Sequence, residues 1–421
     1  MHVGPWVVAV AAVGAALGVT SARAGDRAPL TLDRVVELAR TCAYPSRFAA
    51  LDVDDARARL AGAQALMRDN PTLSGNAGPR LRAPVTIDGT LSIGVPIELG
   101  LRRARAIDVA EHEVRREQLH YATALRAAVQ EAVGEYPRAL HAAERRALAD
   151  ERRQIAEQLV ATAGAREQAG DASRFEVNLA RAELARALSQ ALERDSAVED
   201  ARAALARILA TEPAALGPLH GTLSEAAALE SLQSAIGPVG APSVSEARAE
   251  LDAAHAAVAL AETTWWPDVS AVGSYALDDG DHTAAAGLSL TLPVFSNGQG
   301  DRRAAAVRVE RGRLWRDATQ SQVELERARG AAALERATAA ERVLADDGLP
   351  RAIENEGLAR EAYRAGKLDL ASYVVLRRES LETREEHLDR LLEKGLAALA
   401  VATSEADPRD NAALAPQGEP Q

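Results

Sequence analysis

Two helical stretches in this chain are too long for any compact domain. The first runs from Leu101 to Gln168 and the second from Arg302 to Ala365, and both are poor in helix-breaking residues. Proline interrupts the first only at Pro137, whereas the second is broken near residues 348–350. At a rise of 1.5 Å per residue, an unbroken helix of this length spans roughly 100 Å. The sequence therefore predicts an elongated molecule built on long helices.

The composition indicates that these helices pack side by side. Aromatic residues make up only 3% of the chain, alanine is abundant, and charged residues of both signs are interleaved. Small residues allow close helix packing, and the helices expected after residues 170 and 366 carry leucine at coiled-coil steps. The net charge is −12 and no run of Lys or Arg stands alone. Nucleic acid is therefore excluded as a partner, because phosphate binding needs a basic stripe.

The chain also repeats itself once, at an offset of 196 residues. The segment "EQAGDASRFEVNLAR", which begins at Glu167, is matched by "YRAGKLDLASYVVLR", which begins at Tyr363. At the same offset, Asn70-Pro71 is matched by Trp266-Pro267. This period exceeds the roughly 20 to 50 residues of a solenoid unit. We interpret the chain as two copies of one unit, each with a helix, two strands, a long helix and a returning helix.

These patterns predict the organisation of the whole chain. Residues 1–24 form a signal peptide and residues 405–421 a disordered tail. The units between them are expected as follows: a first repeat at 25–210, with a β-hairpin at 72–97 and a tip turn near 170; a linker at 211–242; and a second repeat at 243–404, with a β-hairpin at 267–295 and a tip turn near 366.

The N-terminal segment favours secretion. Val3 to Val19 is apolar and Ala22-Arg23-Ala24 fits a cleavage site, so Gly25 is expected to begin the mature chain. The alternative is a membrane anchor, which the short length and the interruption at Pro5 disfavour. The single cysteine, Cys42, does not follow the cleavage site, so no lipid anchor is expected.

The two strand pairs carry most of the functional information. Apolar residues alternate with polar or small ones from Ile87 to Ile97, and again from Gly287 to Val294. A tilted strand needs about 9 to 11 residues to cross a bilayer. The alternation is typical of a membrane barrel, although a soluble hairpin packed on a helix shows it too. We expect a lipid-facing set of Leu91, Ile93, Val95, Leu288, Leu290 and Leu292, and a lumen-facing set of Ser92, Gly94, Ser289 and Thr291.

Two strand pairs cannot close a barrel within one chain. Open strand edges in lipid leave backbone groups unpaired, at a cost of several kcal/mol each. Several chains must therefore share one barrel if these strands cross a membrane, and three chains give twelve strands. The predicted fold class is mixed and mainly α: long coiled-coil-like helices and four membrane β-strands in each chain, which trimerises into a 12-strand β-barrel on an α-helical tunnel. The family resemblance described next implies that this tunnel is periplasmic.

The stretches around the turns resemble a known family. "GLSLTLPVFSNGQGDRRAAA" at Gly287 and "AYRAGKLDLASYVVLRRESLETREEHLDRL" at Ala362 resemble the strand-to-helix turn and the tip of TolC-type outer-membrane factors. "LTLDRVVELA" at Leu30 resembles their opening helix, so the resemblance extends from Leu30 to Ser404. It implies a homotrimer in the outer membrane with a large periplasmic part. Such a trimer is a passive exit duct of tripartite efflux or type I secretion.

The resemblance also implies partners and a substrate class. The partners are a periplasmic adaptor (a membrane fusion protein), an inner-membrane pump and the lipid of the outer membrane. The exported substrates are small molecules or metal ions, and "PIELGLRRAR" at Pro96 resembles the corresponding turn of factors that serve heavy-metal exporters.

The tip turns are the candidate entrance, because the resemblance places them at the inner end of the tunnel. The candidate residues are Gly170, Asp171, Ser173, Glu176, Gly366, Lys367 and Asp369. Carboxylates of Asp171, Glu176 or Asp369, repeated by trimer symmetry, would form rings that favour cations. The alternative role is helix capping, for which Asp171 or Ser173, and Asp369, are suited. Val375 stands where family members often carry an acidic residue.

No arrangement of residues indicates catalysis. The sequence has no Cys/His pair, no phosphate-binding glycine loop and no H-E-x-x-H motif. His112 and His120 lack carboxylates at ligand spacing, so we expect no metal site, no cofactor and no enzyme activity. The competing hypothesis is a periplasmic coiled-coil adaptor or scaffold without a pore. An adaptor would have one helical hairpin, so two hairpins with membrane-length strands favour the duct.

Overall fold

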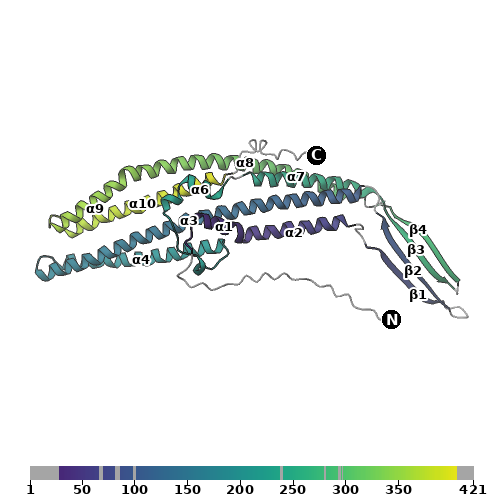
Figure 1. The fold of residues 1–421 in the computed structure, drawn as a ribbon, viewed down its shortest axis with the longest axis horizontal. Coiled ribbons are helices and arrows are strands. Elements are labelled where there is room, and N and C mark those ends of the chain that lie inside the picture. Colours follow the sequence, from purple (N-terminus) through teal and green to yellow (C-terminus); the bar gives the residue numbers. More distant parts are fainter. Residues whose placement is uncertain are drawn as a thin grey trace.

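A computed structural model of the chain describes residues 28–404, except 66–69, 81–85, 98–100, 238–239, 279–280, 293–294 and 296. The predicted signal peptide and C-terminal tail lie outside the described residues. Figure 1 shows an elongated molecule, with helices side by side along its length, a β-sheet at one end and two helix-to-helix turns at the other. Among the described helices, none is both long enough and apolar enough to cross a bilayer.

The elements of the first half are α1 (Leu32–Cys42), α2 (Tyr44–Gln64), β1 (Thr72–Arg80), β2 (Thr86–Ile97), α3 (Arg102–Ala169) and α4 (Arg174–Ile208). A short connecting region holds a 3-10 turn (Pro213–Ala215), α5 (Leu223–Ala226) and α6 (Leu229–Ile236). The second half contains α7 (Pro242–Ala261), a 3-10 turn (Glu262–Trp265), β3 (Asp268–Asp278), β4 (Asp281–Thr291), α8 (Gln299–Val343), a π-helical turn (Leu344–Gly348), α9 (Leu349–Arg364) and α10 (Leu370–Ala402).

The helical sequence pattern that starts at Asp33 predicts one opening helix as far as Met67, with Thr31 or Asp33 as its cap. Met67 lies outside the described residues, and the prediction of a single helix is wrong, because the structure has two helices, α1 and α2. The first begins with the Thr31 side chain accepting a hydrogen bond from the Arg34 amide. The chain then becomes extended at Ala43, and α2 starts with Pro45 in its first turn. Proline cannot donate the backbone hydrogen bond that would continue α1, but it is compatible with the first turn of a new helix.

The break expected near residues 348–350 is milder than a helix end. The residues Leu344–Gly348 form one π-helical turn between α8 and α9, and Pro350 lies in the first turn of α9. In α3, by contrast, the buried Pro137 is accommodated inside a continuous helix of 68 residues.

The strands form one antiparallel sheet in the order β1-β2-β3-β4. The adjacent helices follow the same lateral order, because α2 contacts α3, α3 contacts α7, and α7 contacts α8. One side of the molecule therefore carries β1 and α2, and the other carries β4 and α8 (Figure 1).

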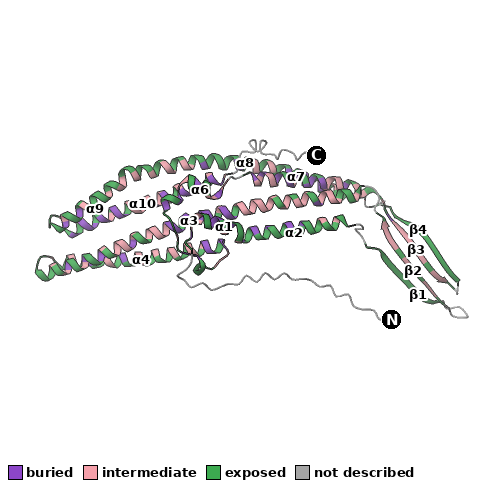
Figure 2. Cartoon of the chain, viewed as in Figure 1, coloured by how far each residue is buried: buried purple, intermediate pink, exposed green. Residues whose placement is uncertain are grey.

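The main hydrophobic core lies midway along the helices, where α3, α4 and α10 meet the short helices. The region between residues 211 and 242 is part of this core, since Leu216, Leu223 and Leu232 are buried in it. Figure 2 shows buried residues concentrated at this middle level, while much of the helical surface is exposed. The Tyr136 hydroxyl donates to the carbonyl oxygens of Leu30 and His220, which fixes the start of the described chain against α3.

Candidate functional sites at the two ends of the molecule

The sheet has one apolar and one polar face. Residues directly opposite in paired strands share a face. The register places Val95, Ala271 and Leu288 in one row and Ile97, Val269 and Leu290 in the next. The rows toward the hairpin ends add Ile93 with Gly273, and Leu91 with Tyr275. Five residues of the predicted lipid-facing set therefore lie on one face: Leu91, Ile93, Val95, Leu288 and Leu290.

Leu292 lies one residue beyond the end of β4 and is exposed. The predicted lumen-facing residues are on the opposite face, where Ser92 lies opposite both Ser74 and Ser274. The hydroxyl groups of Ser74 and Ser92 share a hydrogen bond of 2.8 Å. Such a two-faced sheet suits an apolar medium on one side and water on the other.

Arginines at the strand-to-helix junctions bind the neighbouring elements. Cations at a helix N-terminus oppose the helix dipole, so these arginines do not stabilise the start of α3 through the dipole. The Arg103 guanidinium donates to the carbonyl oxygens of Gln64 at 2.8 Å and Ala65 at 3.3 Å, which closes the end of α2. Arg102 pairs with Asp268 at 2.7 Å. The sequence does not predict these contacts, because no local pattern places the end of α2 or Asp268 near the start of α3.

The two tip turns have the same backbone structure. Gly170 and Gly366 adopt left-handed conformations, with φ of 83° and 69°, which glycine reaches without steric cost. The amide of the following residue bonds five residues back in each, from Asp171 to Arg166 and from Lys367 to Ala362. The glycine amides bond three residues back. These are two copies of the Schellman motif, which ends a helix and reverses the chain.

The next helices begin with side-chain caps. Ser173 accepts from the Glu176 amide at 3.3 Å, and Asp369 accepts from the Ser372 amide at 2.9 Å. Hydrogen bonds from the backbone and side chain of Ser372 lower the pKa of Asp369. Asp171 is exposed but does not cap α4, so of the two cap candidates the structure selects Ser173.

The tips also carry mixed charge. Asp171 and Lys367 occupy equivalent positions immediately after the two turn glycines, and both are exposed. Glu176 lies in the first turn of α4. The structure thus gathers the seven candidate residues at one end of the molecule, with a lysine among the carboxylates.

Contacts of the Tyr363 ring join the first helical hairpin (α3 and α4) to the second (α9 and α10) near the tips. Tyr363 of α9 stacks on Tyr373 of α10 with a centroid distance of 5.0 Å. The Arg166 guanidinium of α3 lies 5.9 Å from the centre of the Tyr363 ring. The first and second hairpins are therefore in contact close to their turns.

A row of ion pairs continues this contact along α10. Glu385 of α10 accepts from Arg145 of α3 at 2.7 Å and from Arg194 of α4 at 3.4 Å. One turn further, Asp389 pairs with His141 at 2.7 Å. These pairs connect the first hairpin to the second over several helical turns.

Glu183 is the most buried acid of this row. It pairs with Arg152 at 2.6 Å, Arg186 at 3.3 Å and Arg378 at 3.4 Å. Burial alone raises the pKa of Glu183, but hydrogen bonding and charge from Arg152, with Arg378 and Arg186, outweigh burial and lower the pKa below its ordinary value of 4.5. The Glu183 carboxylate therefore stays ionised between the hairpins.

A second buried pair lies within the second hairpin. Glu356 of α9 is 3.7 Å from the Arg377 guanidinium of α10, and both side chains are almost fully buried. Ser380 donates to Glu356 at 3.0 Å. Burial lowers the pKa of Arg377, and the negative charge of Glu356 opposes this shift. Such a pair is costly to break, because either charge would be left in the core.

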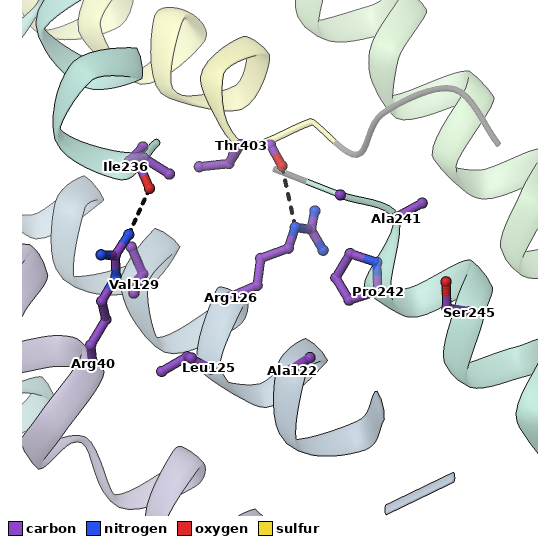
Figure 3. A pocket seen from close by; sticks show the side chains of 11 residues that line it. Arg40, Ala122, Leu125, Arg126, Val129, Ile236, Ala241, Pro242, Ser245 and Thr403 are labelled. Carbon is purple, nitrogen blue, oxygen red and sulfur yellow. Dashed lines mark hydrogen bonds between the residues drawn. The ribbon is translucent and has the colours of Figure 1, made fainter. Parts of the chain in front are cut away.

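A cavity of 440 Å³ lies near the main core (Figure 3). Its two arginines already have structural roles: Arg40 donates to the Ile236 carbonyl at 2.6 Å and Arg126 to the Thr403 carbonyl at 3.2 Å. The remaining lining is mostly apolar, with Ser245 and Thr403 as its polar side chains. These hydrogen bonds tie the ends of α6 and α10 to α1 and α3.

Comparison with known proteins agrees with this architecture. Residues 47–211 match the family described as outer membrane efflux protein. No curated protein sequence matches the chain. Among solved structures, a membrane protein from Pseudomonas aeruginosa has 20% identity and a TM-score of 0.72, over 89% of this chain and 93% of its own.

Two named channels are similar over comparable lengths. The outer membrane protein VceC of Vibrio cholerae has 17% identity and a TM-score of 0.69, over 89% of this chain and 96% of its own. The CmeC outer membrane channel of Campylobacter jejuni has 15% identity and a TM-score of 0.69, over 93% of each chain. At these identities the likeness shows the fold.

Residues 47–211 thus match the outer membrane efflux protein family, and the described chain has the fold of outer-membrane channels. Its resemblance to TolC-type outer-membrane factors is confirmed by the family match over residues 47–211 and by the fold over nearly the whole chain. The expected location in the outer membrane agrees with the family description.

Proposed function

We propose that three copies of this chain form a passive duct across the outer membrane. The observation that carries this proposal is the four-stranded sheet at one end of a long helical body. Strands of 9 to 12 residues, with one apolar face, fit a bilayer. The apolar set defined above faces lipid, and the serine-bearing face lines the lumen.

The open sheet edges require more than one chain. β1 pairs with β2 and β4 pairs with β3, so each outer strand offers a second edge for hydrogen bonding. Lipid cannot satisfy those backbone groups, and only a closed barrel does. Three copies supply twelve strands. The helices then surround a tunnel that continues the lumen into the periplasm.

The tip turns form the entrance of this duct. The two exposed tip turns of each chain have the same backbone structure. Three chains around one axis therefore present six such turns for contact with a periplasmic adaptor. An inner-membrane pump delivers small molecules or metal ions through that adaptor. Since the duct only guides diffusion, no catalytic group is needed in it. We also propose that the chain is divided as the sequence predicts, into a signal peptide, two repeats, a linker between them and a C-terminal tail.

Membrane fractionation and planar-bilayer recording test the proposal together. The full-length protein is expressed and its outer-membrane fraction is purified without boiling. We expect a heat-sensitive trimer band in that fraction and stepwise conductance after reconstitution. A monomeric protein recovered from the soluble periplasm would instead indicate an adaptor or scaffold.

A further inference from the structure

A charged cavity lies at the end of the helical body that is next to the sheet (Figure 1). Small apolar residues of α7, such as Ala254 and Ala257, form its base, and the flanking helices α3 and α8 form its two sides. Its volume is 370 Å³, and small-molecule sites typically measure about 300 to 1,000 Å³. We call it the α7 cavity, and its charged lining residues are Arg102, Glu113, Arg116, Glu250, Asp301 and Arg308.

The α7 cavity is on the same side of the molecule as the polar face of the sheet. Arg102, at the start of α3, lines the cavity and pairs with Asp268 of β3 at 2.7 Å. Asp268 is directly opposite Thr291 in the strand register, so it belongs to the serine-bearing face. Residues of α3 and α8 both line the cavity above α7, which makes this the concave side of the three helices. In the proposed duct, the cavity therefore faces the lumen.

Four of the six charged residues in the α7 cavity already have partners. Arg102 has the partner described above, and Arg116 is 3.2 Å from Glu250. Glu113 is 3.6 Å from Arg59 of α2. A ligand gains little from these four charges, because the attraction of one member of a pair is largely cancelled by the repulsion of the other.

Asp301 and Arg308 are the two charges that are left for a ligand. Both line the cavity, both are exposed, and neither has an ion-pair partner among the described residues. They are seven residues apart on α8, a spacing that places them on one helix face. At a rise of 1.5 Å per residue, they are about 10 Å apart along the helix, with Asp301 nearer the sheet.

We propose that the α7 cavity binds zwitterionic solutes whose opposite charges are about 10 Å apart. The ammonium group of the solute contacts Asp301, its carboxylate contacts Arg308, and the part between them lies on the alanines of α7. An extended peptide covers roughly 3.3 to 3.6 Å per residue, so an uncapped tripeptide has this charge separation. Binding is weak, since a solute that passes through a duct has to leave the site again. This inference rests on the proposed duct and names a class of solute that contacts its wall.

Saturation-transfer-difference NMR of the purified full-length protein tests the site, with triglycine as the probe. Two capped peptides each lack one charge: N-acetyl-triglycine has no ammonium group, and triglycine amide has no carboxylate. We expect each capped peptide to bind about two- to fivefold more weakly than triglycine, which is the usual effect of one exposed ion pair. Equal binding of all three peptides overturns the proposal, because neither charge of the solute is then recognised.

Substitutions assign each charge of the solute to its residue. Asp301→Asn and Arg308→Gln each weaken triglycine binding about two- to fivefold. In Asp301→Asn, triglycine and N-acetyl-triglycine bind equally, because the ammonium group has lost its partner. Arg303→Gln is the matched control and leaves binding unchanged, since Arg303 is exposed on the same helix but does not line the cavity. Equal binding of triglycine by the native chain and all three variants overturns the assignment.

An exchange of the two charges gives a further test. Asp301→Arg alone places two cations in the cavity and weakens triglycine binding, whereas Asp301→Arg with Arg308→Asp restores it, because the peptide then binds in the reverse direction. Equal loss in the single and exchanged variants contradicts the proposed contacts.

The outcomes separate this inference from the function on which it rests. A conducting trimer that binds the three peptides equally overturns the site and leaves the duct in place. Charge-dependent binding by a monomer from the soluble periplasm overturns the duct and supports the site on α8 alone.

Discussion

At the scale of single residues, the buried pair of Glu356 and Arg377 controls the stability of the second hairpin. Glu356→Ala leaves the Arg377 guanidinium in the core without the buried carboxylate that lies 3.7 Å from it. We expect a loss of about 3–5 kcal/mol in the free energy of unfolding, measured by denaturant titration of the full chain. Glu354→Ala, on the exposed side of the same helix, is the matched control and should change stability by less than about 0.5 kcal/mol. Equal losses of unfolding free energy in the two variants would contradict a stabilising role for the Glu356–Arg377 pair.

The carboxylates at the tips have different roles at this scale. Asp369→Ala removes the cap of α10, whereas Asp171→Ala removes charge from an exposed turn. Asparagine keeps the capping ability of aspartate. The double variant Asp171→Asn and Asp369→Asn should therefore fold and trimerise normally but show a weaker preference for cations in planar-bilayer recording.

An unchanged preference for cations in that double variant, together with a loss of stability in Asp369→Ala, would make Asp369 a cap alone and place the selective ring elsewhere. Sequence reasoning named both roles and could not separate them. Ser173 and Asp171 are both plausible caps two residues apart, and only the backbone path shows which one accepts the amide hydrogen bond.

At the scale of elements, the link between the first hairpin and α10 depends on pH. The pKa of Glu183 is lower in the folded chain than the ordinary value of 4.5. The ionised carboxylate therefore contributes its full stabilisation above pH 4.5, and this stabilisation is lost as the pH falls through the lowered pKa of the folded state. In the native chain, we expect the free energy of unfolding to decrease as the pH is lowered below about 4.5. Glu183→Gln should be less stable at neutral pH and show a shallower acid dependence. An identical acid dependence in both proteins would exclude Glu183 as a source.

The sheet makes a separate prediction at the same scale. Leu290→Arg places a charge on the apolar face and should cost about 2–4 kcal/mol near mid-bilayer. Ser289→Arg, the neighbouring residue on the polar face, should cost far less. Trimer yield and heat stability in the outer-membrane fraction measure both. Comparable damage from the two variants would contradict a membrane location for β4.

Much of the element layout could be predicted from sequence, because its signals are local. Alternation predicted the strands, and the glycines at residues 170 and 366 predicted both tip turns. The split at Ala43 was missed because a helical pattern continues across it. The contacts of Arg103 with α2 and of Glu183 with α10 were missed for another reason: they join residues far apart in sequence, which no local pattern brings together.

At the scale of the whole molecule, the central claim is that one chain is a third of a closed duct. The chain presents one sheet whose outer strands, β1 and β4, each leave one edge open. The length of the helices could be predicted from the sequence, but the lateral order of α2, α3, α7 and α8 depends on contacts between residues far apart in the sequence.

Native mass spectrometry of the full-length protein, extracted from the outer membrane in mild detergent, tests that claim most directly. We predict one species with three times the mass of the mature chain, which dissociates into single chains on heating. A folded single chain as the main species in the membrane extract would contradict the account, because its sheet edges could not then be closed by its neighbours.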